Sequence, residues 1–274
     1  MELEQNLDRI RKQGLGLAAI SYDSVEILKN FADRRHITFP LLSDPDSKII
    51  RAFGILNETV KPGTPQFGIP NPGTFVVNAK GTVVAKYFVD TIRERVSASD
   101  ILVQQFGAVA DAASASAATD HVRLTTAAST AVARPGHHIV LSLELDLKPK
   151  MHVYAPGVTD YLPIDWKLEE SPAAKAQPFE YPAARKLHLK AIDETVPVYQ
   201  GRVRITREII FGQEDAVKPL LTPAGELILK GSLRYQACDD RKCYLPETVP
   251  VEWRFHFEGL DRERAPLSLQ RKAP

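Results

Sequence analysis

The first hundred residues alternate between helical and extended patterns of apolar positions. Apolar residues recur at helical spacing from Leu3 to Ile10, and the predicted first helix ends before Gly14. The run LGLAAISYD that follows is short, almost wholly apolar and typical of a buried parallel strand. A second helix with Asp23 or Ser24 as its N-cap, and a second strand in ITFPLLSD, continue the alternation.

The next elements complete an α/β unit. A third helix is predicted after Ser43 or Asp44 as its cap, with Pro45 at its first position. The strands TFVV and TVVAKYFV join through the turn NAKG as a hairpin, and SASDILVQQFG predicts a last helix. This order indicates an α/β sheet. A crossover helix normally follows a strand, so a chain whose helix begins at residue 1 is expected to lack the first strand of its sheet.

The hydrophobic pattern changes after residue 108. Residues 109–120, VADAASASAATD, are small, show no periodicity and predict a linker. Beyond them the apolar period becomes two, and IVLSLELDL predicts a half-buried strand with alternate residues on one face. The residues expected on the buried face are Ile139, Leu141, Leu143, Leu145 and Leu147.

Further segments keep this alternation. ELILKGSLRYQA and VPVEWRFHF predict two more strands, with HVYAP, IDWKLEE and GRVRITREIIF as additional candidates. Short alternating strands separated by Pro and Gly turns, with no helix expected among them, are typical of an antiparallel β-sandwich. Trp166 and Trp253 are expected to be core aromatic residues. We therefore expect an α/β domain in residues 1–108, a linker in 109–120, an all-β sandwich in 121–260 and a C-terminal tail in 261–274.

Charge and composition narrow the classes of function. Lys and Arg number 35 against 34 Asp and Glu, so no basic face for nucleic acid or anionic membrane is implied. No apolar run approaches the ~20 residues that a membrane span needs, and the opening MELEQNLDRI does not have the pattern of a signal peptide. We expect no nucleic-acid partner and no membrane insertion of this chain.

The chain has two cysteines, Cys238 and Cys243, both in the segment YQACDDRKCYLPE. A bridge between them would close about six residues and contribute roughly 2 kcal/mol through loop entropy, against almost 5 kcal/mol for a loop of about 100 residues. A bridge placed for stability is expected to span more chain. A zinc site needs four ligands, and His256 is the only histidine near in sequence, so no metal site is expected. Reversible thiol-disulfide exchange, which requires no cofactor, explains the local pair better.

The first domain resembles the thioredoxin-like fold of the peroxiredoxin and redoxin families. The likeness rests on ISYDSVEILKNFADRRHITFPLLSDPDSKIIRAFGI and NPGTFVVNAKGTVV, and it implies that Pro72 is a cis-proline facing an active site. These families carry a reactive cysteine, or a C-x-x-C pair, at the end of the first strand, whereas no cysteine precedes Cys238 here. We expect Met1 to be an internal methionine of a longer product with its C-x-x-C upstream. The first domain is then N-terminally truncated and has no nucleophile.

The second domain resembles the periplasmic N-terminal domain of DsbD, the thiol:disulfide interchange protein, which is an immunoglobulin-like sandwich. The segments KMHVYAPG, VYQGRVRI and YQACDDRKCYLPE carry the likeness. It implies a reversible disulfide between Cys238 and Cys243, with Cys243 as the attacking cysteine. A cap loop that shields the pair would lie near residues 193–201, with Tyr199 as its aromatic residue.

Charged and aromatic residues surround the cysteine pair in the sequence. The residues between the two cysteines are Asp239, Asp240, Arg241 and Lys242. The two basic residues favour a thiolate and the two acidic residues oppose it, so the formal charges cancel. Tyr235 and Tyr244 flank the pair as further site-proximal candidates. His152 and Tyr154 are expected to pack at a strand edge, and the likeness to DsbD leaves a role near the site open.

The sequence thus predicts a two-domain thiol-disulfide oxidoreductase. Its Cys238–Cys243 pair would pass electrons to or from thioredoxin-fold redox proteins. The alternatives are a non-enzymatic binding module with a structural disulfide, and a peroxide-reducing antioxidant protein whose peroxidatic cysteine is missing from this chain. A dithiol relay of this family works outside the reducing cytosol, so the full-length product is expected to be periplasmic or otherwise exported.

Overall fold

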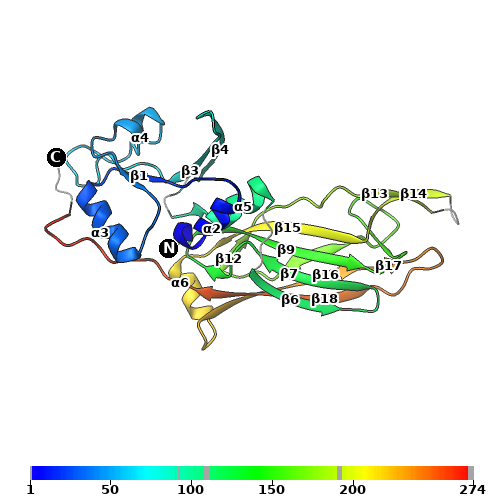
Figure 1. The fold of residues 1–274 in the computed structure, drawn as a ribbon. Helices are drawn as coiled ribbons and strands as arrows, with labels where there is room; N and C mark the ends of the chain where they lie inside the picture. Colours follow the sequence, from blue (N-terminus) through cyan, green and yellow to red (C-terminus); the bar gives the residue numbers. More distant parts are fainter. Residues whose placement is uncertain (1, 90, 92, 108–111, 190–192, 271–274) are drawn as a thin grey trace. The chain divides into compact units, whose positions relative to one another are not determined.

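The chain divides into two compact units (Figure 1). The computed structural model describes residues 2–89, 91, 93–107, 112–189 and 193–270. One unit contains the residues up to Phe106 together with the segment that begins at Asp261, and the other runs from Gly107 to Leu260. The predicted separate tail, 261–274, therefore groups with the first unit as far as the structure describes it.

The first unit is built from short helices and strands. Its elements are α1 (Glu2–Gln5), α2 (Leu7–Lys12), β1 (Ala19–Ser21), α3 (Val25–Arg35), β2 (Leu41–Ser43), α4 (Lys48–Ala52), β3 (Gly73–Val77), β4 (Val83–Phe88), β5 (Arg95–Val96) and α5 (Ala98–Phe106). β1 and β2 pair in parallel, and β3 and β4 form the predicted hairpin. Ser24 is the N-cap of α3, where its hydroxyl accepts a hydrogen bond from the Ile27 N–H. The predicted alternation of helix and strand is confirmed.

Two local predictions for this unit are wrong. The third helix, α4, begins at Lys48 and not at Pro45. The reason is that the Asp44 carboxylate accepts the backbone N–H groups of Lys48 (3.0 Å) and Ile50 (2.9 Å), which fixes the first turn further along the chain. The peptide bond before Pro72 is trans, as are all peptide bonds that the structure describes. Trans is the intrinsically preferred form of an X-Pro bond.

Ion pairs hold the described C-terminal segment against α3. Arg34 Nη1 lies 2.9 Å from Glu263 Oε1, and Arg35 Nη2 lies 2.6 Å from Asp261 Oδ1 and 2.8 Å from Glu263 Oε2. The two arginines end α3, where positive charge also complements the helix dipole. This pairing of charges is the physical reason that the segment belongs to the first unit.

The second unit is almost wholly β-structure. Its elements are β6 (Ala112–Ala118), β7 (Val122–Ala128), β8 (Val132–Ala133), β9 (His137–Leu147), β10 (His152–Tyr154), β11 (Asp165–Leu168), β12 (Ala174–Ala176), β13 (Arg185–Leu189), β14 (Glu194–Gln200), β15 (Arg202–Phe211), α6 (Glu214–Val217), the 3₁₀ turn η1 (Lys218–Leu220), β16 (Glu226–Tyr235), β17 (Ala237–Cys238) and β18 (Glu247–Phe257). Within this unit the strands follow the orders β12-β15-β9-β7-β6, β11-β16-β18-β8 and β13-β14-β10-β17 in three sheets. The short helix α6 and the 3₁₀ turn η1 that follows it depart from an all-β expectation within the described part of this unit. Across the described ranges of the whole chain, no helix is both long and apolar enough to span a membrane.

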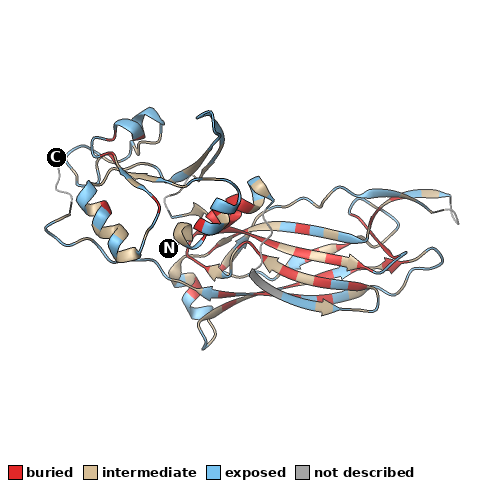
Figure 2. Ribbon diagram, in the orientation of Figure 1, coloured by how far each residue is buried: buried red, intermediate tan, exposed pale blue. Residues whose placement is uncertain are grey.

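One hydrophobic core is shared by the sheet β12-β15-β9-β7-β6 and the sheet β11-β16-β18-β8. The five residues expected on the buried face of β9 are each at most 4% exposed, and residues of β16 and β18 join them in the same cluster. Trp166 and Trp253 are buried in it, with ring centroids 5.6 Å apart. Figure 2 shows buried residues alternating with less buried ones along the long strands. The predicted face-to-face packing of alternating strands is confirmed, while its immunoglobulin-like topology stays a prediction.

Part of the predicted linker is a strand. Residues 112–118 form β6, which pairs antiparallel with β7. Strand pairing uses backbone N–H and C=O groups, so small residues without apolar periodicity can still form the edge of a sheet. Residues 108–111 lie outside the described residues.

The third sheet has a small cluster of its own. Tyr154 of β10, Val196 and Val198 of β14, and Cys238 of β17 are buried together, separately from the main core. This sheet therefore carries the first cysteine on a rigid strand.

Candidate functional site

A disulfide joins Cys238 to Cys243 at one end of the third sheet. Cys238 is the last residue of β17. This strand pairs antiparallel with β10, and the pairing places Cys238 opposite His152. The two cysteines also form an isolated antiparallel bridge with each other. The pairing implied by the likeness to DsbD is present in the structure.

The two cysteines differ in their exposure to solvent. Cys238 is 1% exposed, whereas Cys243 belongs to the exposed residues. Attack by a thiolate from another molecule is therefore expected at Cys243 and not at Cys238. This difference gives the bond one accessible end.

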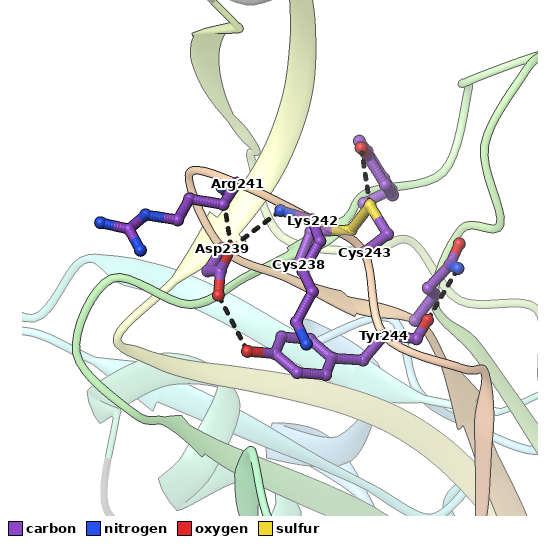
Figure 3. The surroundings of a disulfide bond; sticks show 8 residues. Cys238, Asp239, Arg241, Lys242, Cys243 and Tyr244 are labelled. Carbon is purple, nitrogen blue, oxygen red and sulfur yellow. Dashed lines mark hydrogen bonds between the residues drawn. A yellow bond between two sulfur atoms is a disulfide. The ribbon is translucent and has the colours of Figure 1, made fainter.

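The loop between the cysteines is shaped by Asp239. Its Oδ1 accepts the backbone N–H groups of Arg241 (2.8 Å) and Lys242 (2.9 Å), and its Oδ2 accepts the Tyr244 hydroxyl (2.8 Å), as Figure 3 shows. A carboxylate that caps the amides two and three residues further on is a common way to close a tight turn. Tyr244 N–H in turn donates to Ala237 O (2.8 Å), which closes the loop behind Cys243.

These hydrogen bonds change the pKa values of Asp239 and Tyr244. The backbone N–H groups of Arg241 and Lys242, followed by the Tyr244 hydroxyl, lower the pKa of Asp239 to about 2. The same contact to Asp239 raises the pKa of Tyr244. Lys242 Nζ lies 4.7 Å from the centre of the Tyr244 ring, in a cation–π arrangement. Asp239 is thus ionised at neutral pH, and its charge is directed at the turn.

A cavity of about 640 Å³ opens beside the disulfide. The loop residues 238–243 line one part of it. The other lining residues are His152 and Tyr154 of β10, Tyr161, and Leu187, His188 and Leu189 of β13. The cavity therefore combines the reactive sulfur pair with aromatic, imidazole and aliphatic side chains.

Tyr154 contacts the exposed end of the disulfide. Its hydroxyl lies 3.6 Å from Cys243 Sγ, and its ring stacks on Tyr161 with centroids 4.2 Å apart. Tyr161 in turn donates a hydrogen bond to Glu194 Oε2 (2.6 Å), which raises the pKa of Tyr161 to about 12. Burial, with a smaller contribution from Glu194, raises the pKa of Tyr154. Tyr154 therefore keeps its proton and can donate it in a hydrogen bond to sulfur.

His152 lies at the buried end of the disulfide. It is 1% exposed, and neither ring nitrogen has a hydrogen-bond partner among the residues that the structure describes. Burial lowers the pKa of His152, although the carboxylates of Asp240 and Asp239 oppose this shift. Its ring meets the Tyr154 ring edge-on, with centroids 5.6 Å apart.

The structure brings most of the predicted site residues together. The two cysteines, Asp239, Asp240, Arg241 and Lys242 line the cavity. Tyr244 does not line it but holds Asp239 from the outside of the loop.

Two site-proximal candidates of the second unit do not line the cavity. Tyr199 lies opposite Val153 on β14, so strand alternation turns it away from the face of His152 and Tyr154, into the main core, where its hydroxyl donates to Pro182 O (2.6 Å). The expected cap loop at 193–201 is largely strand β14, and residues of β13 line the cavity instead. Tyr235 is fully buried in the same core, with its hydroxyl 2.7 Å from Thr119 Oγ1. Pro72 follows a trans bond in the first unit, and its place near the cysteine pair stays a prediction.

Tyr161 and the β13 residues are missing from the sequence-based site. Tyr161 lies in no strand, and its role depends on Glu194, which is 33 residues away. The alternation in HVYAP does place His152 and Tyr154 on one face, and this signal identifies them once Cys238 is known to lie beside that strand.

Two family models match the chain, one in each unit. Residues 1–86 match the AhpC/TSA family, and residues 120–252 match the family described as thiol:disulfide interchange protein DsbD, N-terminal. Both matches point to the class of thiol redox proteins. The chain joins an AhpC/TSA-type segment to a DsbD N-terminal-type domain, which confirms both resemblances.

Individual relatives match about a third of the chain. A Mycobacterium tuberculosis protein whose name assigns it to the peroxiredoxins is 39% identical over 89 residues. These residues are 32% of this chain and 56% of that protein. Peroxiredoxin Bcp of Escherichia coli is 33% identical over 81 residues, which are 30% of this chain and 51% of that protein. The chain thus spans about half the length of the curated relatives it matches.

One solved structure matches part of this chain. It is the N-terminal periplasmic domain of ScsB from Proteus mirabilis, with 12% identity and a TM-score of 0.33 over 57% of this chain and 49% of that one. A score of that size does not establish a shared fold.

Proposed function

We propose that this chain is a thiol-disulfide oxidoreductase that passes electrons through Cys238 and Cys243 to or from a thioredoxin-fold partner. One observation carries the proposal: the disulfide has a buried end at Cys238 and an exposed end at Cys243, beside a cavity. Thiol-disulfide exchange needs one sulfur that an attacking thiolate can reach. The matches to a thiol:disulfide interchange family and to peroxiredoxins support redox chemistry of this kind.

The exchange proceeds through a mixed disulfide on Cys243. A thiolate of a dithiol partner attacks Cys243 Sγ, the bond to Cys238 breaks, and Cys238 Sγ leaves with the electron pair. The second partner thiolate then attacks the partner sulfur of the mixed disulfide and releases Cys243. The partner becomes a disulfide, and its two protons and two electrons pass to the cysteine pair. Every step is reversible, so the same geometry serves either direction.

Two features of the site support this chemistry. The Tyr154 hydroxyl can stabilise negative charge on Cys243 Sγ, because it is neutral and 3.6 Å away. The negative charge of Asp239 is already stabilised by hydrogen bonds from backbone N–H groups and from the Tyr244 hydroxyl. Asp239 therefore opposes the thiolate less than its formal charge suggests.

The proposal assigns no redox step to the first unit. Both cysteines of the chain lie at positions 238 and 243, so electron transfer is assigned to the second unit. We also assign the full-length product to the periplasm or another exported location, because protein disulfides persist in oxidising compartments. We take its partners to be thioredoxin-fold proteins, by analogy with the DsbD N-terminal family.

Thiol counting under a graded redox series tests the function. The full chain is equilibrated with reduced and oxidised glutathione or dithiothreitol, and its thiols are counted at each potential. We expect the pair to titrate between about −180 and −300 mV, the range of physiological thiol pools. A pair that stays oxidised well below about −300 mV is a structural disulfide, and this result would support a binding module instead.

A further inference from the structure

His152 lies directly across the strand pair from Cys238. Partners in an antiparallel pair point to the same face of the sheet, with Cβ atoms about 4.5–5.5 Å apart. Both residues are 1% exposed, and both line the cavity beside the disulfide. The imidazole and the buried cysteine are therefore neighbours on one face of the sheet.

The imidazole has no hydrogen-bond partner within the described residues at either nitrogen. Buried polar atoms in folded proteins are nearly always paired, so this exception calls for a physical explanation. The disulfide sulfurs carry no hydrogen and cannot donate to a ring nitrogen. Reduction creates an S–H donor on Cys238, and a neutral imidazole has one nitrogen that accepts. The histidine thus gains a partner when the disulfide opens.

The surroundings favour a neutral imidazole in the oxidised protein. Burial lowers the pKa of His152, against the opposing effect of Asp240 and Asp239. The other ionisable side chains around the cavity are Tyr154 on β10, Arg241 and Lys242 on the loop, Tyr161, and His188 on β13. A neutral imidazole is the form that can accept a proton.

We infer that His152 accepts the thiol proton of Cys238 when this cysteine resolves a mixed disulfide on Cys243; the inference rests on the proposed exchange function. The S–H proton moves to a ring nitrogen, and Cys238 Sγ forms a bond with Cys243 Sγ. The bond between Cys243 and the partner sulfur breaks, and the partner sulfur leaves with the electron pair as a thiolate. The imidazolium then returns its proton to that thiolate or to water. Over the whole exchange the partner gains two electrons, which the cysteine pair loses.

Stopped-flow reaction of the fully reduced chain with dithiobis-nitrobenzoate isolates this step. Attack by Cys243 releases one coloured nitrothiobenzoate, and attack by Cys238 on the mixed disulfide releases another without further reagent. We expect His152→Gln to slow the second release at least about tenfold below about pH 7, where an unassisted thiol with pKa ~8.5 is mostly protonated. The first release should be unchanged. His256→Gln, a matched control at an exposed position of β18 that does not line the cavity, should leave both releases as they are.

The outcomes separate this inference from the exchange function. A second release that is equally fast in His152→Gln from about pH 5 to 9 overturns the role of His152 and leaves the exchange function standing. A wild-type chain that releases only one equivalent overturns the exchange function itself. Should the variant fail to fold, NMR titration of the wild-type ring decides the matter. The His152 resonances should titrate differently in the oxidised and reduced chain, and identical titration in both states overturns the inference.

Discussion

Tyr154 Oη lies 3.6 Å from Cys243 Sγ, and the two residues are 89 positions apart in the sequence. The disulfide sulfur has no hydrogen, so the phenol is the donor in this contact. A hydrogen bond to sulfur favours its charged form over its protonated form. Tyr154 should therefore lower the pKa of the Cys243 thiol once the disulfide is open.

Replacing Tyr154 with Phe should reduce the reactivity of Cys243. Loss of one hydrogen bond, worth about 0.5–1.5 kcal/mol, corresponds to alkylation that is roughly two- to tenfold slower near neutral pH. The measurement is the rate of iodoacetamide modification of the reduced chain as a function of pH. The midpoint of that profile should move to higher pH in Tyr154→Phe.

Tyr235→Phe is the matched control for this experiment. It also removes one phenolic hydroxyl, but that hydroxyl bonds to Thr119 Oγ1 in the main core. Its alkylation profile should coincide with that of the wild type. A shift as large as the one in Tyr154→Phe would mean that neither hydroxyl acts directly on the sulfur.

Single cysteine variants should differ in their capture of an external disulfide. In Cys238→Ser the exposed Cys243 can form a mixed disulfide with glutathione that no second cysteine resolves. In Cys243→Ser the one remaining thiol is 1% exposed. Mass spectrometry should show glutathione addition at least about tenfold faster in Cys238→Ser. Equal rates in the two variants would contradict the assignment of Cys243 as the accessible end.

The turn at Asp239 should respond to acid in a defined range. The pKa of Asp239 is lowered from 3.8 to about 2 in the folded chain, so the ionised side chain favours the folded turn above the unfolded value. This contribution is lost as the pH falls from near 3.8 through about 2. The amide resonances of Arg241 and Lys242, followed by NMR, should report an inflection near the lower value.

Two substitutions separate the charge of Asp239 from its shape. Asp239→Asn keeps an oxygen that can accept the two backbone N–H groups, so it should keep the turn and abolish the inflection. Asp239→Ala should lose both. An inflection that persists in Asp239→Asn would assign the titration to another group.

Gly231 allows β11 to approach β16 closely. A Cβ at this position would lie 2.3 Å from Lys167 O, which is a backbone atom that cannot move without disturbing the sheet. Gly231→Ala should therefore destabilise the chain by about 1–3 kcal/mol in denaturant unfolding. Ser232→Ala, at the next position of β16, adds no Cβ and should have a smaller effect. Equal stability of Gly231→Ala and wild type would contradict this packing.

The long strands could be predicted from the sequence because their burial is one-sided. Leu141, Leu143 and Leu145 alternate with polar residues, and a strand with one buried face permits no other period. The cysteine pair and its charged loop were predictable as well, since the disulfide and the hydrogen bonds of Asp239 join residues that are close in sequence.

The rest of the site depends on contacts between distant segments. Nothing local indicates that β10 lies beside β17, so the position of His152 opposite Cys238 could not be derived from the sequence. Tyr199 was expected in a cap loop because of the resemblance to DsbD, whereas its segment pairs with β10 as β14 and the pairing turns Tyr199 toward the main core. The strand β6 was missed because its stability comes from backbone pairing, which apolar periodicity does not report.

The chain returns to α3 at Asp261, so the first unit is discontinuous in sequence. The entire second unit is inserted between its two segments. A fragment that stops at Phe106 would separate Arg34 and Arg35 from their acidic partners and remove Ala265 from the small cavity beside β1 and α3. To produce the first unit alone, the segment that begins at Asp261 would therefore have to be fused to residues 1–106 through a short linker. A single cut after Phe106 would leave the segment from Asp261 attached to the second unit and the first unit without it.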